Sequence, residues 1–237
     1  MDGKQPLSGS EFDKLIDRQM RRWEMARAQC LEQREVKATK TVQDFVAFSR
    51  QVGSSGAEVA RLLAERLDWP LFDKEILHVM AGDDRVRERL YEQMDERDVG
   101  WMEQTLRWLL EGDFRVEDYF HRLTETVLAL AWQGHAVFLG RGVDLILPRD
   151  RGLRVRIVAL REWRVRRYAE RLKLGEALAL TQVERIDRER ADFIRRYFRK
   201  PLDDISRYDL TINAEQFKTT ESVDLILAAL RMRGVIA

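Results

Sequence analysis

The chain has 237 residues, of which 45% are hydrophobic and 35% are charged, with a net charge of +1. This composition is typical of a globular protein with a substantial core, and it excludes a disordered chain and an overall electrostatic attraction to nucleic acid. One cysteine excludes an internal disulfide, three scattered histidines give no zinc-binding spacing, and no apolar run approaches the roughly 18–20 residues of a membrane span. We therefore expect a cytoplasmic protein without membrane or nucleic-acid partners.

Residues 10–35 are predicted to form an amphipathic helix, because apolar residues recur mostly at three- and four-residue steps while the opposite face is charged. We expect this helix to dock on the body of the protein, on a second copy in a homo-oligomer, or on another partner. The polar stretch after it is typical of a linker. We therefore expect an appendage over residues 1–40 and a main domain over residues 41–237.

In the main domain, short β-prone apolar runs alternate with helical segments, which predicts an α/β fold with a mainly parallel sheet. Residues 74–133 carry apolar side chains at helical intervals and are too long for a simple crossover, so we expect a helical insertion that covers a site. An amphipathic helix with the sequence "TTESVDLILAALRMR" closes the chain. The five candidate strands are residues 45–49, 69–72, 135–140, 154–160 and 208–213.

The first candidate strand runs into the turn "RQVGSSG" and then into an amphipathic helix. Small residues allow several backbone N–H groups to face one anion, and the helix N-terminus adds partial positive charge, so this turn is a candidate phosphate-binding loop. It departs from the pattern G-x-x-x-x-G-K-[ST], because Gly56 and Ala57 stand where the lysine and the hydroxyl residue belong. The alternative is that the glycines only make a tight strand-to-helix turn.

Two further strand ends carry charged residues. In "WPLFDKEIL", Asp73 follows the second strand, where it either caps the next helix or faces a site. In "FLGRGVDLIL", Arg141 follows the third strand between two glycines. Ligand sites in open α/β sheets lie at the carboxyl ends of the strands, so Arg141 is a candidate for binding a phosphate. The alternative is a surface arginine at a turn.

Residues 161–175 and 184–202 form two arginine-rich helical segments with a turn near Gly175. In a phosphate-transfer enzyme, mobile arginines that close over the transferring group stabilise its charge. The acidic residues among them also allow ion pairs at three- and four-residue spacing, so a solvated helix surface is the alternative.

Taken together and in order, these groups resemble the cytidylate kinase-like family, the relatives of bacterial cytidylate kinase whose phosphate loop is degenerate. The resemblance runs from about Phe45 to Ala229 through "SRQVGSSGAEVARLLAERL", "WPLFDKEIL", "FLGRGVDLIL", "RVRIVALREWRVRR", "DRERADFIRRYF" and "YDLTINAEQFKTTESVDLIL". It implies a P-loop kinase-type fold with a five-stranded sheet, a helical acceptor region over residues 74–133 and an arginine lid over residues 161–200.

The resemblance also implies roles for individual residues. The loop would cradle the phosphates of ATP, Arg141 would hold the phosphate of the acceptor nucleotide, and Asp73 would face the acceptor. Arg164 and Arg167 would begin the lid helix, and Asp187 and Arg190 would contact the sugar and phosphate of the acceptor. The loop residues concerned are Gly53, Ser54, Ser55 and Gly56.

The expected function is therefore transfer of the ATP γ-phosphate to a nucleoside monophosphate, with CMP or dCMP as the acceptor by resemblance. ATP and Mg²⁺ are the expected cofactors. We hypothesise that Arg50 or a lid arginine replaces the charge of the missing lysine, and that Ser54, Ser55, phosphates and water hold Mg²⁺. Two alternatives are a kinase for another small acceptor and a pseudokinase that senses nucleotides or binds a partner through the helix over residues 10–35.

Overall fold

The computed structural model describes residues 42–91 and 118–236, together with five helical residues before them: Lys14, Arg18, Met20, Arg21 and Met25. The prediction of a helix over residues 10–35 therefore falls largely outside the described residues. Met20 is buried in the core, whereas Met25 is exposed. Within the described residues, no helix is both long enough and apolar enough to cross a membrane.

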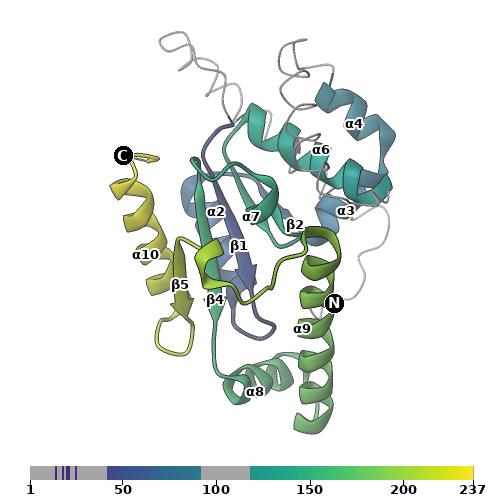
Figure 1. The fold of residues 1–237 in the computed structure, drawn as a ribbon. Helices are drawn as coiled ribbons and strands as arrows, with labels where there is room; N and C mark the ends of the chain where they lie inside the picture. Colours follow the sequence, from purple (N-terminus) through teal and green to yellow (C-terminus); the bar gives the residue numbers. More distant parts are fainter. Residues whose placement is uncertain are drawn as a thin grey trace.

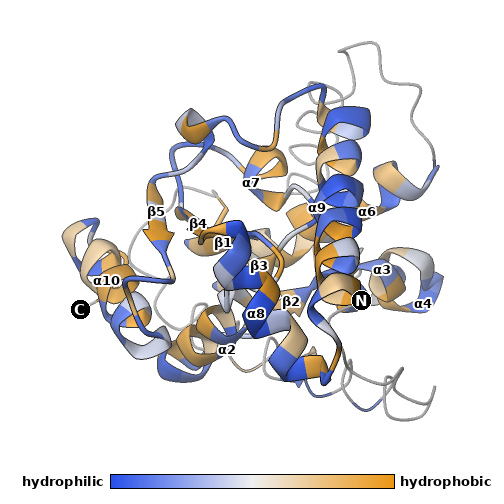
Figure 2. Cartoon of the chain, turned by 90° about the horizontal axis from the view of Figure 1, so that it is seen from below, coloured by the Kyte–Doolittle hydropathy of each residue, from blue (hydrophilic) through white to orange (hydrophobic). Residues whose placement is uncertain are grey.

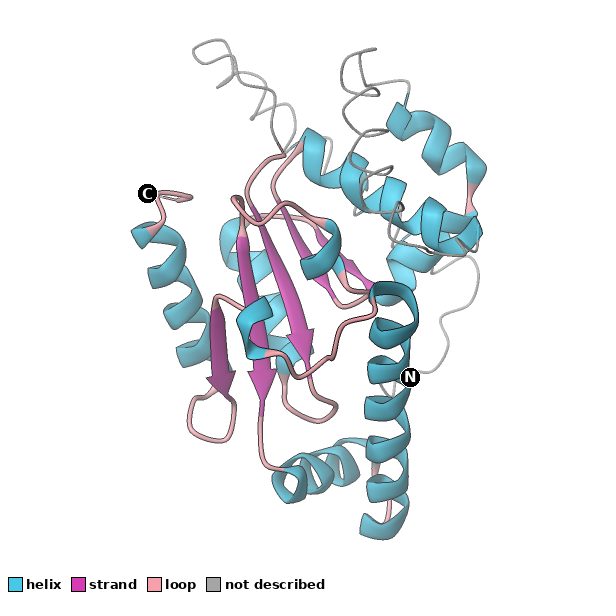
Figure 3. Ribbon diagram, viewed as in Figure 1, coloured by secondary structure: helices cyan, strands magenta, loops and turns pink. Residues whose placement is uncertain are grey.

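A five-stranded parallel sheet forms the centre of the domain (Figure 3). The strands lie in the order β2-β3-β1-β4-β5, and each pairs in parallel with its neighbour. All five predicted strands are confirmed, as is the α/β fold class. The carboxyl ends of parallel strands lie at one edge of a sheet, where ligands of α/β proteins bind. The strands are β1 (Phe45–Arg50), β2 (Leu71–Asp73), β3 (Ala136–Leu139), β4 (Leu153–Val158) and β5 (Leu210–Asn213).

Helices cover both faces of the sheet (Figure 1). One face packs against α2 (Gly56–Leu67) and α10 (Thr219–Met232), and the other against α3 (Lys74–Gly82), α6 (Asp118–Gln133) and α7 (Val143–Ile146). The remaining elements are α4 (Asp84–Tyr91), α8 (Arg161–Leu172), α9 (Glu176–Phe198) and η1 (Ile205–Arg207).

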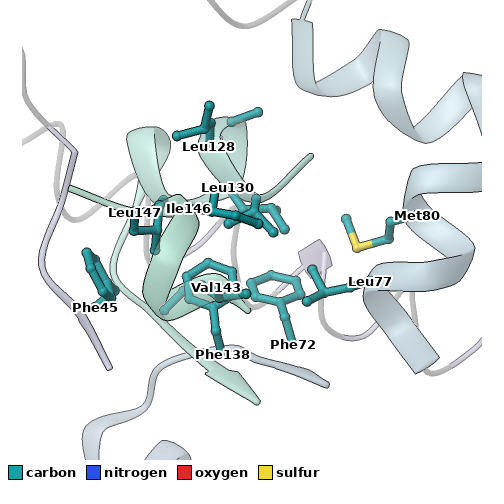
Figure 4. Packing of buried hydrophobic residues seen from close by; sticks show 14 of the residues in the cluster. Phe45, Phe72, Leu77, Met80, Leu128, Leu130, Phe138, Val143, Ile146 and Leu147 are labelled. Atoms are coloured by element: carbon teal, nitrogen blue, oxygen red, sulfur yellow. The ribbon is translucent and has the colours of Figure 1, made fainter. Parts of the chain in front are cut away.

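The alternation of side chains along each strand explains this two-sided core. In β1, Phe45 and Ala47 face the layer of α3, α6 and α7, while Val46 and Phe48 face α2 and α10. Figure 4 shows the first of these layers, in which the rings of Phe72 and Phe138 stack at a centroid distance of 5.6 Å. Since both faces of the strands are apolar, the sheet is buried on both sides, as parallel sheets usually are.

A smaller apolar cluster attaches α8 and α9 to the loop after β1. Val52 of that loop is buried against Val165 and Tyr168 of α8 and against Val183 and Ile186 of α9. Many residues of both helices are hydrophilic (Figure 2), although Leu178 and Leu180 of α9 are exposed. The two arginine-rich segments are therefore helical, as predicted, and they lie at the edge of the sheet to which the strands point (Figure 1).

The described parts of the region over residues 74–133 are helical, comprising α3, α4 and α6. Helices α3 and α6 pack together through Leu77, Met80, Leu123 and Val127, which are all buried. The functional role expected for this region stays a prediction.

Candidate functional site

A cleft of about 240 Å³ lies at the carboxyl ends of β1, β2 and β3. It is lined by one basic side chain at or just after the end of each of these strands, by a fourth from α9 and by a fifth from η1. An apolar wall of side chains from α9 and the segment after it completes the cleft. The basic residues are Arg50, Lys74, Arg141, Arg190 and Arg207, and the apolar residues include Ile186, Phe193, Ile194 and Leu202.

The turn after β3 has an unusual backbone that the glycines make possible. Gly140, Arg141 and Gly142 all have positive φ, at 89°, 56° and 69°. A Cβ atom at Gly142 would lie 2.3 Å from the ring of Phe198, so this position accepts only glycine without a shift of that ring. An arginine with φ of 56° is strained, and such strain in an α/β protein is often found at functional sites.

The side chain of Arg141 lies between two aromatic rings. Its guanidinium carbon is 5.1 Å from the ring centre of Phe193 and 5.8 Å from that of Tyr119. Among the described residues, neither Nε of Arg141 nor the hydroxyl of Tyr119 has a hydrogen-bond partner, although both atoms are buried. Burial raises the pKa of Tyr119 above its usual value, and the charge of Arg141 partly opposes this shift. Buried groups without partners in a polar cleft indicate a place for a ligand.

Arg50 reaches the cleft through a slot between two glycines. A Cβ atom at Gly56 would lie 2.6 Å from Cβ of Arg50, and one at Gly140 would lie 2.4 Å from Nη1 of the same side chain. Arg50 is 8% exposed, and its carbonyl accepts a hydrogen bond of 3.0 Å from Nη1 of Arg190. The structure therefore brings Arg50, Arg141 and Arg190 together, as three of the predicted site residues.

The charge of Arg207 is already balanced within the protein. Its Nη2 lies 2.6 Å from Oδ2 of Asp144, and both side chains are buried. Breaking a buried ion pair of this kind costs much free energy, because it leaves an unpaired charge in the interior. Arg207 and Asp144 therefore form part of the floor of the cleft and contribute little net charge to it.

The loop after β1 is closed by groups of α8 and α9. The backbone N–H of Val52 donates to Oδ1 of Asp187 at 3.0 Å, and Arg164 donates from Nη1 to the carbonyl of Val52 at 3.0 Å and to Oδ2 of Asp187 at 2.6 Å. A Cβ atom at Gly53 would lie 2.4 Å from the carbonyl oxygen of Arg164. We call the contacts among Val52, Arg164 and Asp187 the loop latch.

The hydroxyl of Ser54 is engaged inside the protein. It donates to the carbonyls of Gln51 at 2.8 Å and Ile157 at 3.3 Å, and Ser54 is fully buried. Ser54 has no exposed surface in this conformation, and its expected contact with Mg²⁺ stays a prediction. Among the described residues, no group of three or more His, Cys, Asp or Glu side chains is placed to hold a metal ion. Ser55 makes no side-chain cap to α2, so the N-terminus of this helix is not closed by its own N-cap residue.

Several predicted site residues do not line this cleft. Arg167 is exposed and lies over the ring of Trp163, at 4.9 Å from its centre. Asp73 caps α3 by accepting hydrogen bonds from the N–H groups of Glu75 and Ile76, which is the first of its two predicted readings. Their contacts with a nucleotide stay predictions. The same is true of Arg164, Asp187, Gly53, Ser54, Ser55 and Gly56.

Sequence reasoning missed two basic residues of the cleft, Lys74 and Arg207. Lys74 comes two residues after the end of a predicted strand, which was the available signal, but no motif spacing singled it out. Arg207 lies in η1, outside every motif that the sequence singled out, and it is held by the ion pair with Asp144.

The model of the cytidylate kinase-like family matches residues 45–216 of the chain. No curated protein matches this chain. The solved structure of an uncharacterized protein from Eubacterium ventriosum covers 80% of this chain and 99% of its own, with 22% sequence identity and a TM-score of 0.65. A shikimate kinase from Acinetobacter baumannii in complex with shikimate covers 82% of this chain and 96% of its own, with 20% identity and a TM-score of 0.42. The likeness to the Eubacterium ventriosum protein shows a shared fold.

Proposed function

Because the chain belongs to the cytidylate kinase-like family, we propose that it is a nucleoside monophosphate kinase-like phosphotransferase. Its fold is the α/β fold of P-loop kinases, built on five parallel strands. The proposed reaction transfers the γ-phosphate of ATP to the phosphate of CMP, dCMP or a similar small acceptor. The observation that carries this proposal is the convergence of Arg50, Arg141 and Arg190 in one cleft at the carboxyl ends of the strands.

The chemistry of the cleft suits a nucleotide acceptor. The guanidinium of Arg141 is held between Phe193 and Tyr119, and a planar fork of this kind matches the oxygens of a phosphate. Its buried Nε has no hydrogen-bond partner among the described residues and would gain one from a bound phosphate. Phe193, Ile194 and Leu202 give the cleft an apolar wall against which a base could pack.

We place the phosphates of ATP at the N-terminus of α2, where Ser55 makes no side-chain cap and the helix adds partial positive charge. Arg50 is our candidate to replace the charge of the missing lysine, because it ends β1 directly before this loop and lines the cleft. Bound ATP would supply the phosphoryl group, and Mg²⁺ would neutralise charge on its phosphates. Since Ser54 faces inward, we expect phosphates and water to be the main ligands of that ion.

In this reaction an oxygen of the acceptor phosphate attacks the γ-phosphorus of ATP, and the bond from that phosphorus to the β-phosphate oxygen breaks. The products are a nucleoside diphosphate and ADP. Arg141 and Arg190 would hold the attacking phosphate, and Arg50 would stabilise the charge on the group in transfer. Catalysis of this kind depends on position and charge more than on a covalent step.

The test is product formation from ATP, Mg²⁺ and a panel of nucleoside monophosphates, with the intact protein, Arg141→Ala and the control Arg188→Ala. Arg188 is an exposed arginine of α9 that does not line the cleft. We expect turnover of CMP or dCMP, a loss of about 10²-fold or more in Arg141→Ala, and a change below about twofold in the control. Thermal unfolding of each variant confirms that it is folded.

A second candidate function is a nucleotide-binding regulator without catalysis. The loop latch favours it, because Asp187 occupies a backbone N–H of the loop and α8 covers Gly53. The same assay separates the two functions. Absence of turnover with every monophosphate, in a folded protein that still binds nucleotide, would contradict the kinase proposal and support the regulator.

A further inference from the structure

Lys74 completes a row of positive charges at the ends of three neighbouring strands. Strands β2, β3 and β1 lie side by side in the sheet, and Lys74, Arg141 and Arg50 stand at or just after their carboxyl ends. All three side chains line the same cleft. Since these strands are parallel, the three charges lie along one edge of the sheet.

The charge of Lys74 is easier to redirect than that of Arg207. Its ammonium lies 3.1 Å from Oε1 of Glu75, in a pair whose side chains are 28% and 42% exposed. A pair between partly exposed side chains contributes little stability and exchanges readily for another anion. By contrast, the pair of Arg207 with Asp144 is buried, with side chains that are 5% and 7% exposed. A bound anion can therefore recruit Lys74 but not Arg207.

The side chain of Lys74 already lines the cleft. Its ammonium stands on a flexible four-carbon stem. The first turn of α2 can supply no such group, because the buried Gly56 occupies the position of the usual lysine and a Cβ atom there would overlap Arg50. The side chain of Lys74 instead comes from the end of β2, two strands away from β1, and lines the cleft from there.

We propose that Lys74, together with Arg50, forms a phosphate subsite in this cleft and supplies the ammonium charge that the loop after β1 lacks. The inference rests on the proposed function only for the identity of the phosphorylated ligand. Phosphate binding itself is measurable without turnover, so the two proposals can fail separately.

Inorganic pyrophosphate is the probe, titrated calorimetrically into the full chain at about 0.15 M ionic strength, where distant surface charges are largely screened. The variants are Lys74→Met, Lys74→Arg and the control Lys200→Met, which removes the charge of an exposed lysine outside the cleft. We expect a Kd about tenfold weaker for Lys74→Met, a Kd within about threefold of the wild type for Lys74→Arg, and a change below about twofold for the control.

Glu75→Gln is expected to strengthen pyrophosphate binding, the opposite of the effect of Lys74→Met. This substitution removes the carboxylate that competes for Lys74, so we expect pyrophosphate to bind about two- to fivefold more tightly. Wild-type affinity in Lys74→Met, or no binding of pyrophosphate by the wild type, would overturn the subsite. Unchanged affinity in Glu75→Gln would also contradict it. Binding that depends on Lys74 in a protein without kinase turnover would support the subsite and contradict the proposed function.

Discussion

Two glycine-containing turns of this protein stand at the carboxyl ends of adjacent strands and yet differ in what they expose. In the turn after β1, side chains of α8 and α9 bond the N–H and the carbonyl of Val52 through the loop latch. In the turn after β3, Arg141 lines an open cleft and its buried Nε has no hydrogen-bond partner among the described residues. A glycine-rich turn therefore predicts a sharp backbone path, whereas the neighbouring elements decide whether a ligand can reach the turn.

The largest expected effect on the free energy of unfolding comes from replacing a glycine by alanine in either turn. Gly53→Ala places a Cβ atom 2.4 Å from the backbone carbonyl oxygen of Arg164, at a φ of 77°. We expect a loss of about 2–4 kcal/mol in the free energy of unfolding. Gly142→Ala meets only the ring of Phe198, which can move, so we expect a loss of about 1–3 kcal/mol. Urea unfolding measures both variants.

The control for these substitutions is Gly82→Ala, because open space surrounds this helical glycine. We expect it to be neutral or to stabilise the protein by up to about 1 kcal/mol. Equal losses for Gly53→Ala and Gly142→Ala would show that α8 constrains the turn after β1 no more than the ring of Phe198 constrains the turn after β3.

The second prediction concerns the loop latch. Asp187→Ala removes the acceptor of the Val52 N–H and leaves Arg164, whose side chain is 7% exposed, without its carboxylate. We expect a loss of about 2–3 kcal/mol in the free energy of unfolding. Asp192→Ala breaks an exposed ion pair with Arg195 on the same helix and should change it by less than about 0.5 kcal/mol. A small effect at both positions would show that the latch contributes little to closing the loop.

The smallest expected effect on the free energy of unfolding is at Asp73, which is the last residue of β2. Burial raises the pKa of Asp73 above its usual value, although N–H donation from Ile76 opposes the shift. A raised pKa in the folded state gives stability that is present below the unfolded pKa, near 3.8, and is lost as the pH rises through the folded pKa. Asp73→Asn keeps a good N-cap, so we expect a change below about 1 kcal/mol.

The pH dependence provides the check at Asp73. Relative to the wild type, Asp73→Asn should become more stable as the pH rises from about 3.5 to 7. Denaturant unfolding across this range measures the difference. A difference that is flat with pH, or that falls as the pH rises, would contradict the raised pKa.

Much of the fold could be predicted from the sequence, because alternating strand and helix patterns leave few arrangements open. The family resemblance is confirmed by the match over residues 45–216. Arg141 was identifiable because it follows a buried strand between two glycines. Lys74 was not, because its proximity to Arg50 and Arg141 follows from the order β2-β3-β1, which no local pattern encodes.

Residues Asp187 and Arg190 show why the site was harder to predict than the fold. They are three positions apart on α9 and therefore lie on neighbouring parts of one helix surface. Asp187 nevertheless bonds to the loop, whereas Arg190 lines the cleft and donates to the carbonyl of Arg50. Asp187 therefore contacts the loop and Arg190 contacts the cleft. The packing of α9 on Val52 determines which residues of the helix meet each of them.

The slot that holds Arg50 links three positions of the sequence sterically. A Cβ atom at position 56 would lie 2.6 Å from Cβ of Arg50, and one at position 140 would lie 2.4 Å from its Nη1. The first of these contacts would persist with any residue at position 50 except glycine, whereas the second depends on a side chain as long as arginine. The usual lysine could therefore be placed at position 56 only if the backbone of this turn moved, so its absence is a property of the whole turn and not of one position.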